Sequence, residues 1–274
     1  MPNAAPRSAG KSEFPWWLVA TLVLAAIAAA AIFASDLYSQ VFATVAKGIG
    51  ITIAVTVVAF AAASAIGLGI ALMALSGSAW LRQTARFYVE IIRGVPILVL
   101  LFWIAFAGVP TFIAGWNFLA APLQEAGLLG ALQVRDVPLL WRAVLALMIG
   151  YSPFIAEVFR AGIQSVDPGQ IEAAKALGLS GYRRFRHIVM PQAIRTILPP
   201  LGNDFIALVK DSSLVSVLGV ADITQMGKIY AAGSFRFFET YSIVAYIYLI
   251  LTVGLSMALR ALERRLRRRG GGSG

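Results

Sequence analysis

The stretch IEAAKALGLSGYRRFRHIVMP, residues 171–191, is the longest run of this chain that is not typical of a membrane span. It combines an alanine-rich helix signal with a cluster of arginines, and apolar segments flank it on both sides. The fold therefore depends on whether the flanking segments span a membrane. The function depends on what the polar loop between them does.

Composition places the chain in a membrane. Of its 274 residues, 59% are hydrophobic and 13% are charged, and the mean hydropathy is +0.80. This is too apolar for one water-soluble domain. The chain has no cysteine, which excludes disulfides and thiolate metal sites, and its only histidine, His187, cannot build a metal site alone.

Six apolar runs approach or exceed the roughly 20 residues that a spanning helix needs. They are residues 16–34, 49–75, 87–109, 139–161, 193–214 and 241–259. Pro15 and Trp16 suit a helix start in the interfacial aromatic belt, and no cleavage site marks a signal peptide, so the first run is kept as a true span. The sequence predicts an all-α integral membrane protein with about six transmembrane helices.

The basic residues predict the orientation. With six spans, seventeen of the 23 Lys and Arg residues fall on the side of both termini and of the loops 76–86 and 162–192. By the positive-inside rule this side is cytoplasmic. The net charge of +10 is then explained by topology and by contact with anionic membrane lipid, and no nucleic acid partner is expected.

The segment 110–138 is ambiguous. Its apolar residues could form a seventh span, but Pro122, Gln124 and Glu125 lie together near its centre, and a seventh crossing would move basic residues outside. We predict an external or interfacial insert. The sequence GGGSG at 270–274 is typical of a flexible linker.

The opening stretch and the residues just before it predict two short helices. Asp167 can cap the first, Pro168 fits its first position, Gly178 supplies the left-handed residue that ends it, and Ser180 can cap the second. An isolated helix of about 10 residues is not stable in water, so it must dock on something. On charge alone, the segment would equally suit an ordinary positive-inside loop.

Residue spacing distinguishes these interpretations. The letters EAA at 172–174, Gly178 and IVMP at 188–191 resemble the pattern E-A-A-x3-G-x9-I-x-L-P, with Met190 in place of leucine. This is the EAA signature of permeases in ATP-binding-cassette (ABC) importers. The stretches VEIIRGVPILVLLF, YSPFIAEVFRAGIQSVDPGQIEAAKALG and LPPLGNDFIALVKDSSLVSVLGVADI are similar to permeases of the polar amino acid uptake subfamily, of the histidine, glutamine, arginine and glutamate types.

The resemblance implies the type I ABC importer transmembrane-domain fold, with the short helix as a coupling helix in a groove of a cytoplasmic ATPase. Glu172 would make the ionic contact, Ala173 and Ala174 the close-packing face, and Gly178 the turn. The implied divisions are a cytoplasmic tail at 1–15, an additional span and external loop at 16–43, a permease core at 44–265, and a basic tail with a Gly-rich linker at 266–274. The additional span and the insert depart from five-helix members.

The same resemblance implies the partners of a bacterial inner-membrane importer. These are a second permease of the same or a similar chain, two ATPases that bind ATP and Mg, and an external solute-binding protein that delivers an amino acid. This chain would hold no cofactor and would not be an enzyme. Its Gly-Lys-Ser sequence around Lys11 lacks the rest of a phosphate-binding loop.

Polar residues inside predicted spans are candidates for a substrate path, because placing them in lipid is costly. In 193–214, Asn203 and Lys210 share one helix face, and Asp204 and Asp211 share the adjacent face. These side chains could bind a zwitterion or could satisfy one another. Prolines at 199 and 200 and a glycine at 202 predict a weakened helix just before them.

Further candidates lie in 139–161. Tyr151 and Ser152 are near its middle, and Glu157 is one turn from Arg160, so it could pair locally or belong to the substrate path. Arg93, near the inner end of the third span, is predicted to be a snorkelling anchor. In the second span, the glycines at 67 and 69 permit close helix packing.

Two alternatives stay open. One is an ion- or proton-coupled secondary transporter, with Asp204, Asp211 and Glu157 as a carboxylate relay. Such a transporter has no reason to carry an EAA loop. The other is an ABC importer of an opine or another small polar solute, because the mixed charges do not select one cargo.

Overall fold

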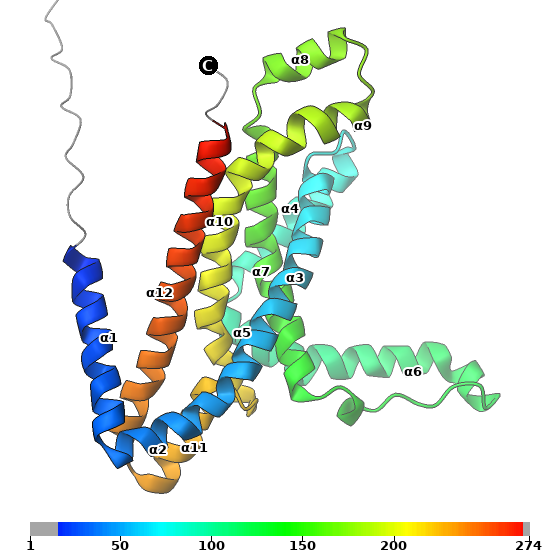
Figure 1. Ribbon diagram of the computed structural model, residues 1–274. Helices are drawn as coiled ribbons and strands as arrows, with labels where there is room; N and C mark the ends of the chain where they lie inside the picture. The colour runs from blue at the N-terminus through cyan, green and yellow to red at the C-terminus, as the bar shows by residue number, and fades with distance from the viewer. Residues whose placement is uncertain (1–15, 271–274) are drawn as a thin grey trace, which may run out of the picture.

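The computed structural model describes residues 16–270, and every regular element in that range is helical (Figure 1). The tail predicted at 1–15, Lys11 within it, and the linker residues 271–274 lie outside the described residues. The helices form an elongated bundle with α8 and the end of α12 at one end and α2 and α11 at the other.

The first two predicted spans, 16–34 and 49–75, are both helical. Helix α1 covers Trp16–Ala34, the short helix α2 covers Asp36–Val45, and α3 covers Ile49–Ala74. Helices α2 and α3 are joined by a single 3-10 turn, Ala46–Gly48. A Cβ at Gly48 would lie 2.3 Å from the backbone carbon of Asp222, so only glycine lets the chain come this close to the segment before α11.

The third predicted span, 87–109, is not one helix. Helix α4, Ala79–Gly94, ends within this run. After a break of two residues, α5 covers Ile97–Trp103. Pro96 explains the break, because the residue before a proline is pushed out of the helical region, and Val95 is extended (φ −100°, ψ 128°). From α5 the chain continues through one π-helical turn, Ile104–Gly108, into α6, Val109–Glu125.

The predicted insert projects from the bundle. Figure 1 shows α6 running across the direction of α7 and extending beyond it, with the chain returning alongside, so α6 does not run parallel to the other long helices as a further crossing. Asn117 ties the two arms together, donating to the carbonyl of Leu132 at 2.7 Å and accepting from its N–H at 2.9 Å. At the base, buried Arg142 donates to three carbonyls, those of Ala105, Val134 and Val137.

The second half of the chain contains the quoted loop. Helix α7 covers Leu139–Gln164, α8 covers Pro168–Ala176, α9 covers Gly181–Arg184, and a π turn leads into α10, Met190–Asp211. Helix α10 is continuous through its two prolines, so the predicted weakening does not become a break. The chain then passes through a 3-10 segment, Ser212–Leu218, to α11, Ile223–Ser234, and α12, Phe237–Gly270.

Asp222 is the N-cap of α11. Its carboxylate accepts from the Gln225 N–H at 2.7 Å and from the Tyr248 hydroxyl of α12 at 3.2 Å. Burial raises the pKa of this carboxyl, while the bonds from Gln225 and Tyr248 oppose the rise.

Helix α7 is the centre of the packing. It contacts α3, α10, α4 and α5, and the largest buried cluster is built from its inward residues and those of α3 and α5. Close approach to α3 depends on Gly67, where a Cβ would lie 2.9 Å from the Ser152 carbonyl and from an Ile155 methyl. Gly69, by contrast, faces open space.

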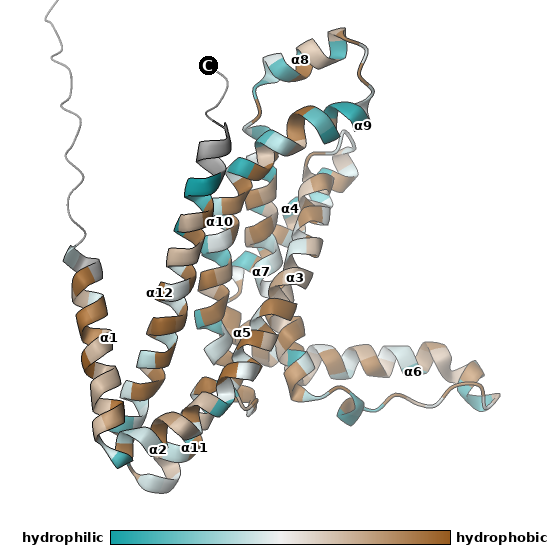
Figure 2. Ribbon diagram, viewed as in Figure 1, coloured by the Kyte–Doolittle hydropathy of each residue, from teal (hydrophilic) through white to brown (hydrophobic). Residues whose placement is uncertain are grey.

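Four helical stretches are long and apolar enough to cross a membrane by length and composition: Asp36–Ala74, Ile97–Glu125, Leu139–Gln164 and Phe237–Arg265. Val19–Ala34 is a shorter apolar helix. In Figure 2 apolar residues run along the bundle, whereas hydrophilic residues gather at α9 and toward the end of α12. The chain is a multi-pass, all-helical membrane protein.

Candidate functional site

Helix α8 and the turn after it form a knob at one end of the bundle (Figure 1). Asp167 caps it, accepting from the Gly169 N–H at 2.7 Å, and Pro168 opens the first turn. Gly178 ends it with φ +73°, a left-handed conformation that favours glycine. These three local predictions are confirmed, whereas Ser180 forms no side-chain cap on α9.

The knob has one inward and one outward face. Ala174 is buried, only 3% exposed, so it packs within its own chain and does not lie on the outward face. Glu172 and Ala173 are exposed. Leu177, which no sequence motif singled out, is 82% exposed at the end of α8. A large apolar side chain this exposed on a polar loop is itself a docking signal.

A cavity of about 430 Å³ lies where the α4–α5 break faces α7 and α10. Its polar lining is Arg93, Tyr151, Asp204 and Asp211, and its remaining walls are mostly apolar. The Tyr151 hydroxyl donates to a carboxylate oxygen of Asp211 at 2.6 Å. The predicted shared face of Asp204 and Asp211 therefore looks into a cavity.

Asp204 has unused bonding capacity. Its Oδ2 atom is buried and has no hydrogen-bond partner among residues 16–270. A buried acceptor without a partner is costly, and such atoms are commonly satisfied by a ligand or by water.

Arg93, predicted to be a snorkelling anchor, is exposed. Its guanidinium lies over the Phe154 ring, 5.2 Å from the centroid, and the residue lines the same cavity as the two aspartates. The helix break at Pro96 places the end of α4 opposite α7, which no local sequence signal specifies. The cavity thus presents a cation and two carboxylates to one space.

The other predicted path residues lie elsewhere. Asn203 and Lys210 are exposed and do not line this cavity. Ser152 is fully buried and bonds to the Tyr88 hydroxyl at 2.7 Å. Glu157 pairs with Arg160 at 2.5 Å, the local pairing considered above, and lines a different cavity.

The cavity suits a small zwitterion or cation. Arg93 can donate to a carboxylate, and Asp204 can accept from an ammonium group while apolar walls enclose the rest. No group of three or more His, Asp or Glu side chains that could hold a metal ion occurs within the described part of the chain.

The chain matches known proteins over most of its length. Residues 63–268 match the family described as binding-protein-dependent transport system inner membrane component. The chain is 38% identical over 199 residues to the glutamine transport system permease protein GlnP of Escherichia coli K12, covering 72% of this chain and 82% of that one. It is 35% identical over 197 residues to the probable amino-acid permease protein YxeN of Bacillus subtilis, covering 72% and 80%.

A third relative is the octopine transport system permease protein OccM of Rhizobium radiobacter, 37% identical over 194 residues, covering 71% and 74%. Among solved structures, an amino acid ABC transporter crystallised with histidines superposes with a TM-score of 0.69 at 37% identity, covering 85% of this chain and 98% of that chain. The inward-facing MetNI methionine ABC transporter shares the fold, with a TM-score of 0.63 at 21% identity and coverage of 85% and 99%.

Proposed function

This chain belongs to the family of binding-protein-dependent transport system inner membrane components, and from that premise we propose that it builds half of an import pathway for polar amino acids. It is a permease subunit of an ABC importer with the type I transmembrane fold. A secondary transporter is not favoured, because the relatives are ABC permeases.

The cavity between α4, α7 and α10 supports an amino acid as cargo. Arg93 is positioned for the carboxylate, Asp204 for the ammonium group, and Asp211, already bonded to Tyr151, adds a second carboxylate. The similar permeases include one named for glutamine transport and one named for octopine transport. Another small polar solute is therefore the second candidate cargo.

The partners follow from the family. In this proposal two cytoplasmic ATPases bind ATP and Mg, an external binding protein delivers cargo, and a second permease of the same or a similar chain completes the pathway in a bacterial inner membrane. Both termini and the knob around α8 face the cytoplasm. Closure of the ATPases moves α8, and α8 moves α7 and α10, between which it is inserted.

The proposal rests on the exposed side chains of α8. Glu172, Ala173 and Leu177 are exposed on a capped helix too short to be stable alone, at the end of the bundle opposite α2 and α11. Small side chains let a partner approach closely, Leu177 offers apolar area, and Glu172 can pair with a basic residue of the ATPase.

Replacing Glu172 tests the proposal. Glu172→Arg places a like charge against the expected partner, so ATPase binding should weaken about tenfold or more, and ATP-driven amino acid uptake should fall with it. Uptake into proteoliposomes and co-purification of the ATPase are the two measurements. Glu125→Arg makes the same change on the exposed end of α6 and should leave both unaltered. Full uptake by Glu172→Arg would contradict docking at α8.

A further inference from the structure

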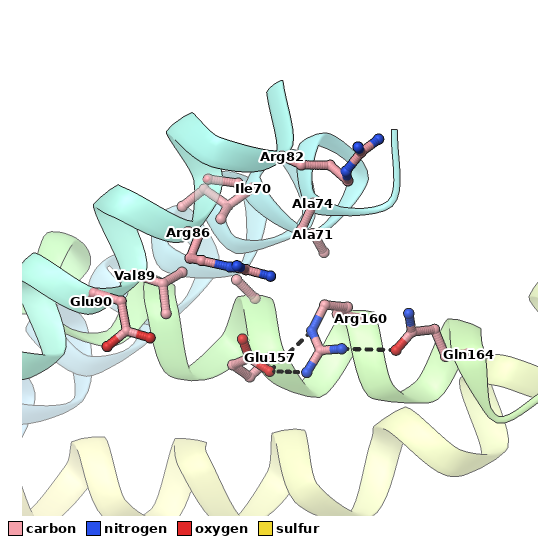
Figure 3. A pocket seen from close by; sticks show the side chains of 12 residues that line it. Ile70, Ala71, Ala74, Arg82, Arg86, Val89, Glu90, Glu157, Arg160 and Gln164 are labelled. Atoms are coloured by element: carbon pink, nitrogen blue, oxygen red, sulfur yellow. Dashed lines mark hydrogen bonds and ion pairs between the residues drawn. The ribbon is translucent and has the colours of Figure 1, made fainter. Parts of the chain in front are cut away.

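A second cavity, of about 330 Å³, lies between α3, α4 and α7 toward the end of the bundle that carries α8 (Figure 3). It shares no lining residue with the cavity assigned to the substrate. Alanines from three helices line it, so small side chains leave the space open: Ala71, Ala74, Ala85 and Ala156.

Three arginines line this cavity. Arg82 and Arg86 lie one turn apart on α4, and Arg160 faces them from α7. Arg160 is engaged, with Glu157 at 2.5 Å and Gln164 at 2.8 Å. Arg82 donates to the carbonyls of Ser76 and Gly77 at 3.0 and 2.8 Å, which fixes its position without neutralising its charge.

The Arg86 side chain is unpaired. No hydrogen bond or ion pair of its guanidinium occurs within residues 16–270. Figure 3 shows it directed over the Glu157–Arg160 pair, whereas Glu90 lies at the other end of the cavity. With Glu90 and Glu157 as the two carboxylates against three arginines, the lining keeps an excess of one positive charge.

The charged residues of α4, Arg82, Arg86 and Glu90, are exposed and lie on the side of the helix that lines this cavity. The opposite face carries large exposed apolar side chains, Trp80 at 81%, Phe87 at 69% and Ile91 at 52%. In a bilayer such a face contacts acyl chains. A positively charged cavity on the other side of the same helix, near the polar end of the bundle, is therefore within reach of the headgroups of the surrounding lipid.

We propose that this cavity binds the phosphate of an anionic phospholipid headgroup, with Arg86 as the main donor and Arg82 beside it. Guanidinium groups donate in pairs to phosphate oxygens, and basic pockets between spanning helices suit such headgroups. One excess positive charge matches a phosphodiester, which carries one negative charge, better than it matches a free phosphate dianion.

Lipid retention tests this assignment without requiring transport. The full-length chain in neutral detergent is mixed with phosphatidylglycerol or phosphatidylcholine, with and without inorganic phosphate, and bound lipid is counted by native mass spectrometry. We expect selective retention of phosphatidylglycerol that millimolar phosphate does not displace. Arg86→Gln should weaken it about fivefold, and Arg183→Gln, an exposed arginine of α9 outside the cavity, should not.

A second variant keeps the charges and removes the space. Ala74→Leu fills the cavity while all three arginines remain, and it should also release phosphatidylglycerol; Arg86→Lys should retain part of the binding. Equal losses in Arg86→Gln and Arg183→Gln would show general surface attraction and overturn the site. Displacement of the lipid by inorganic phosphate would overturn the lipid as the ligand.

Discussion

Asp204 is the residue on which recognition of cargo should depend most directly. One of its carboxylate oxygens is buried without a partner, and the residue lines the cavity together with Arg93. Its neighbour Asn203 is exposed and does not line that cavity, although the two are adjacent in sequence. One step along a helix turns a side chain by about a quarter of the circumference, so adjacent polar residues need not share a role.

Replacing Asp204 should therefore affect binding more than replacing Asn203. Asp204→Asn removes one charge-assisted bond to an ammonium group, which should raise the KM for uptake about tenfold or more. Asn203→Ala should leave the KM within about twofold. Concentration-dependent uptake into proteoliposomes measures both, and an unchanged KM in Asp204→Asn would remove this carboxylate from the substrate site.

At the scale of helices, the contact between α3 and α7 organises the bundle around one glycine. Gly67 admits the Ser152 carbonyl and the Ile155 side chain of α7 at a distance that any Cβ would obstruct, whereas Gly69 touches nothing within 4 Å. Both were plausible packing glycines in the sequence, and only the pairing of the two helices distinguishes them.

The two glycines provide a matched pair of substitutions. Gly67→Ala overpacks the interface and should cost about 1–3 kcal/mol of stability, lowering the Tm of the purified protein by several degrees. Gly69→Ala should be neutral or slightly stabilising, because alanine is the better helix former and space is available. Thermal unfolding in detergent checks both, and equal Tm values would argue against this α3–α7 packing.

At the scale of the whole molecule, the knob around α8 and the α6 arm lie in different parts of the bundle, α8 at the end and α6 projecting from its side toward the other end (Figure 1). The proposed orientation puts α8 in the cytoplasm and the tip of the α6 arm outside, the arrangement that the basic residues predict.

Single cysteines can test this orientation, since the chain has none of its own. Leu128, at the tip of the arm, and Leu177, after α8, are 72% and 82% exposed. A membrane-impermeant maleimide added to spheroplasts should label Leu128→Cys and leave Leu177→Cys unlabelled until the membrane is opened. Labelling of Leu177→Cys in intact spheroplasts would reverse the orientation.

Local sequence determined the features that depend on neighbouring residues alone. Composition predicted a membrane protein, and apolar run length predicted the long apolar helices α3, α7 and α12. Asp167, Pro168 and Gly178 predicted both ends of α8, because capping and left-handed turns involve only a few consecutive residues. The EAA spacing identified the permease family through the same short stretch.

Tertiary structure decided which of these residues meet. It buried Ala174 within the chain, brought Arg93 to the aspartates of α10 across the break at Pro96, and separated Glu157 from them into a second cavity. Each outcome depends on how helices distant in sequence cross. Such crossings are set by summed packing over whole helix faces, which no short motif encodes.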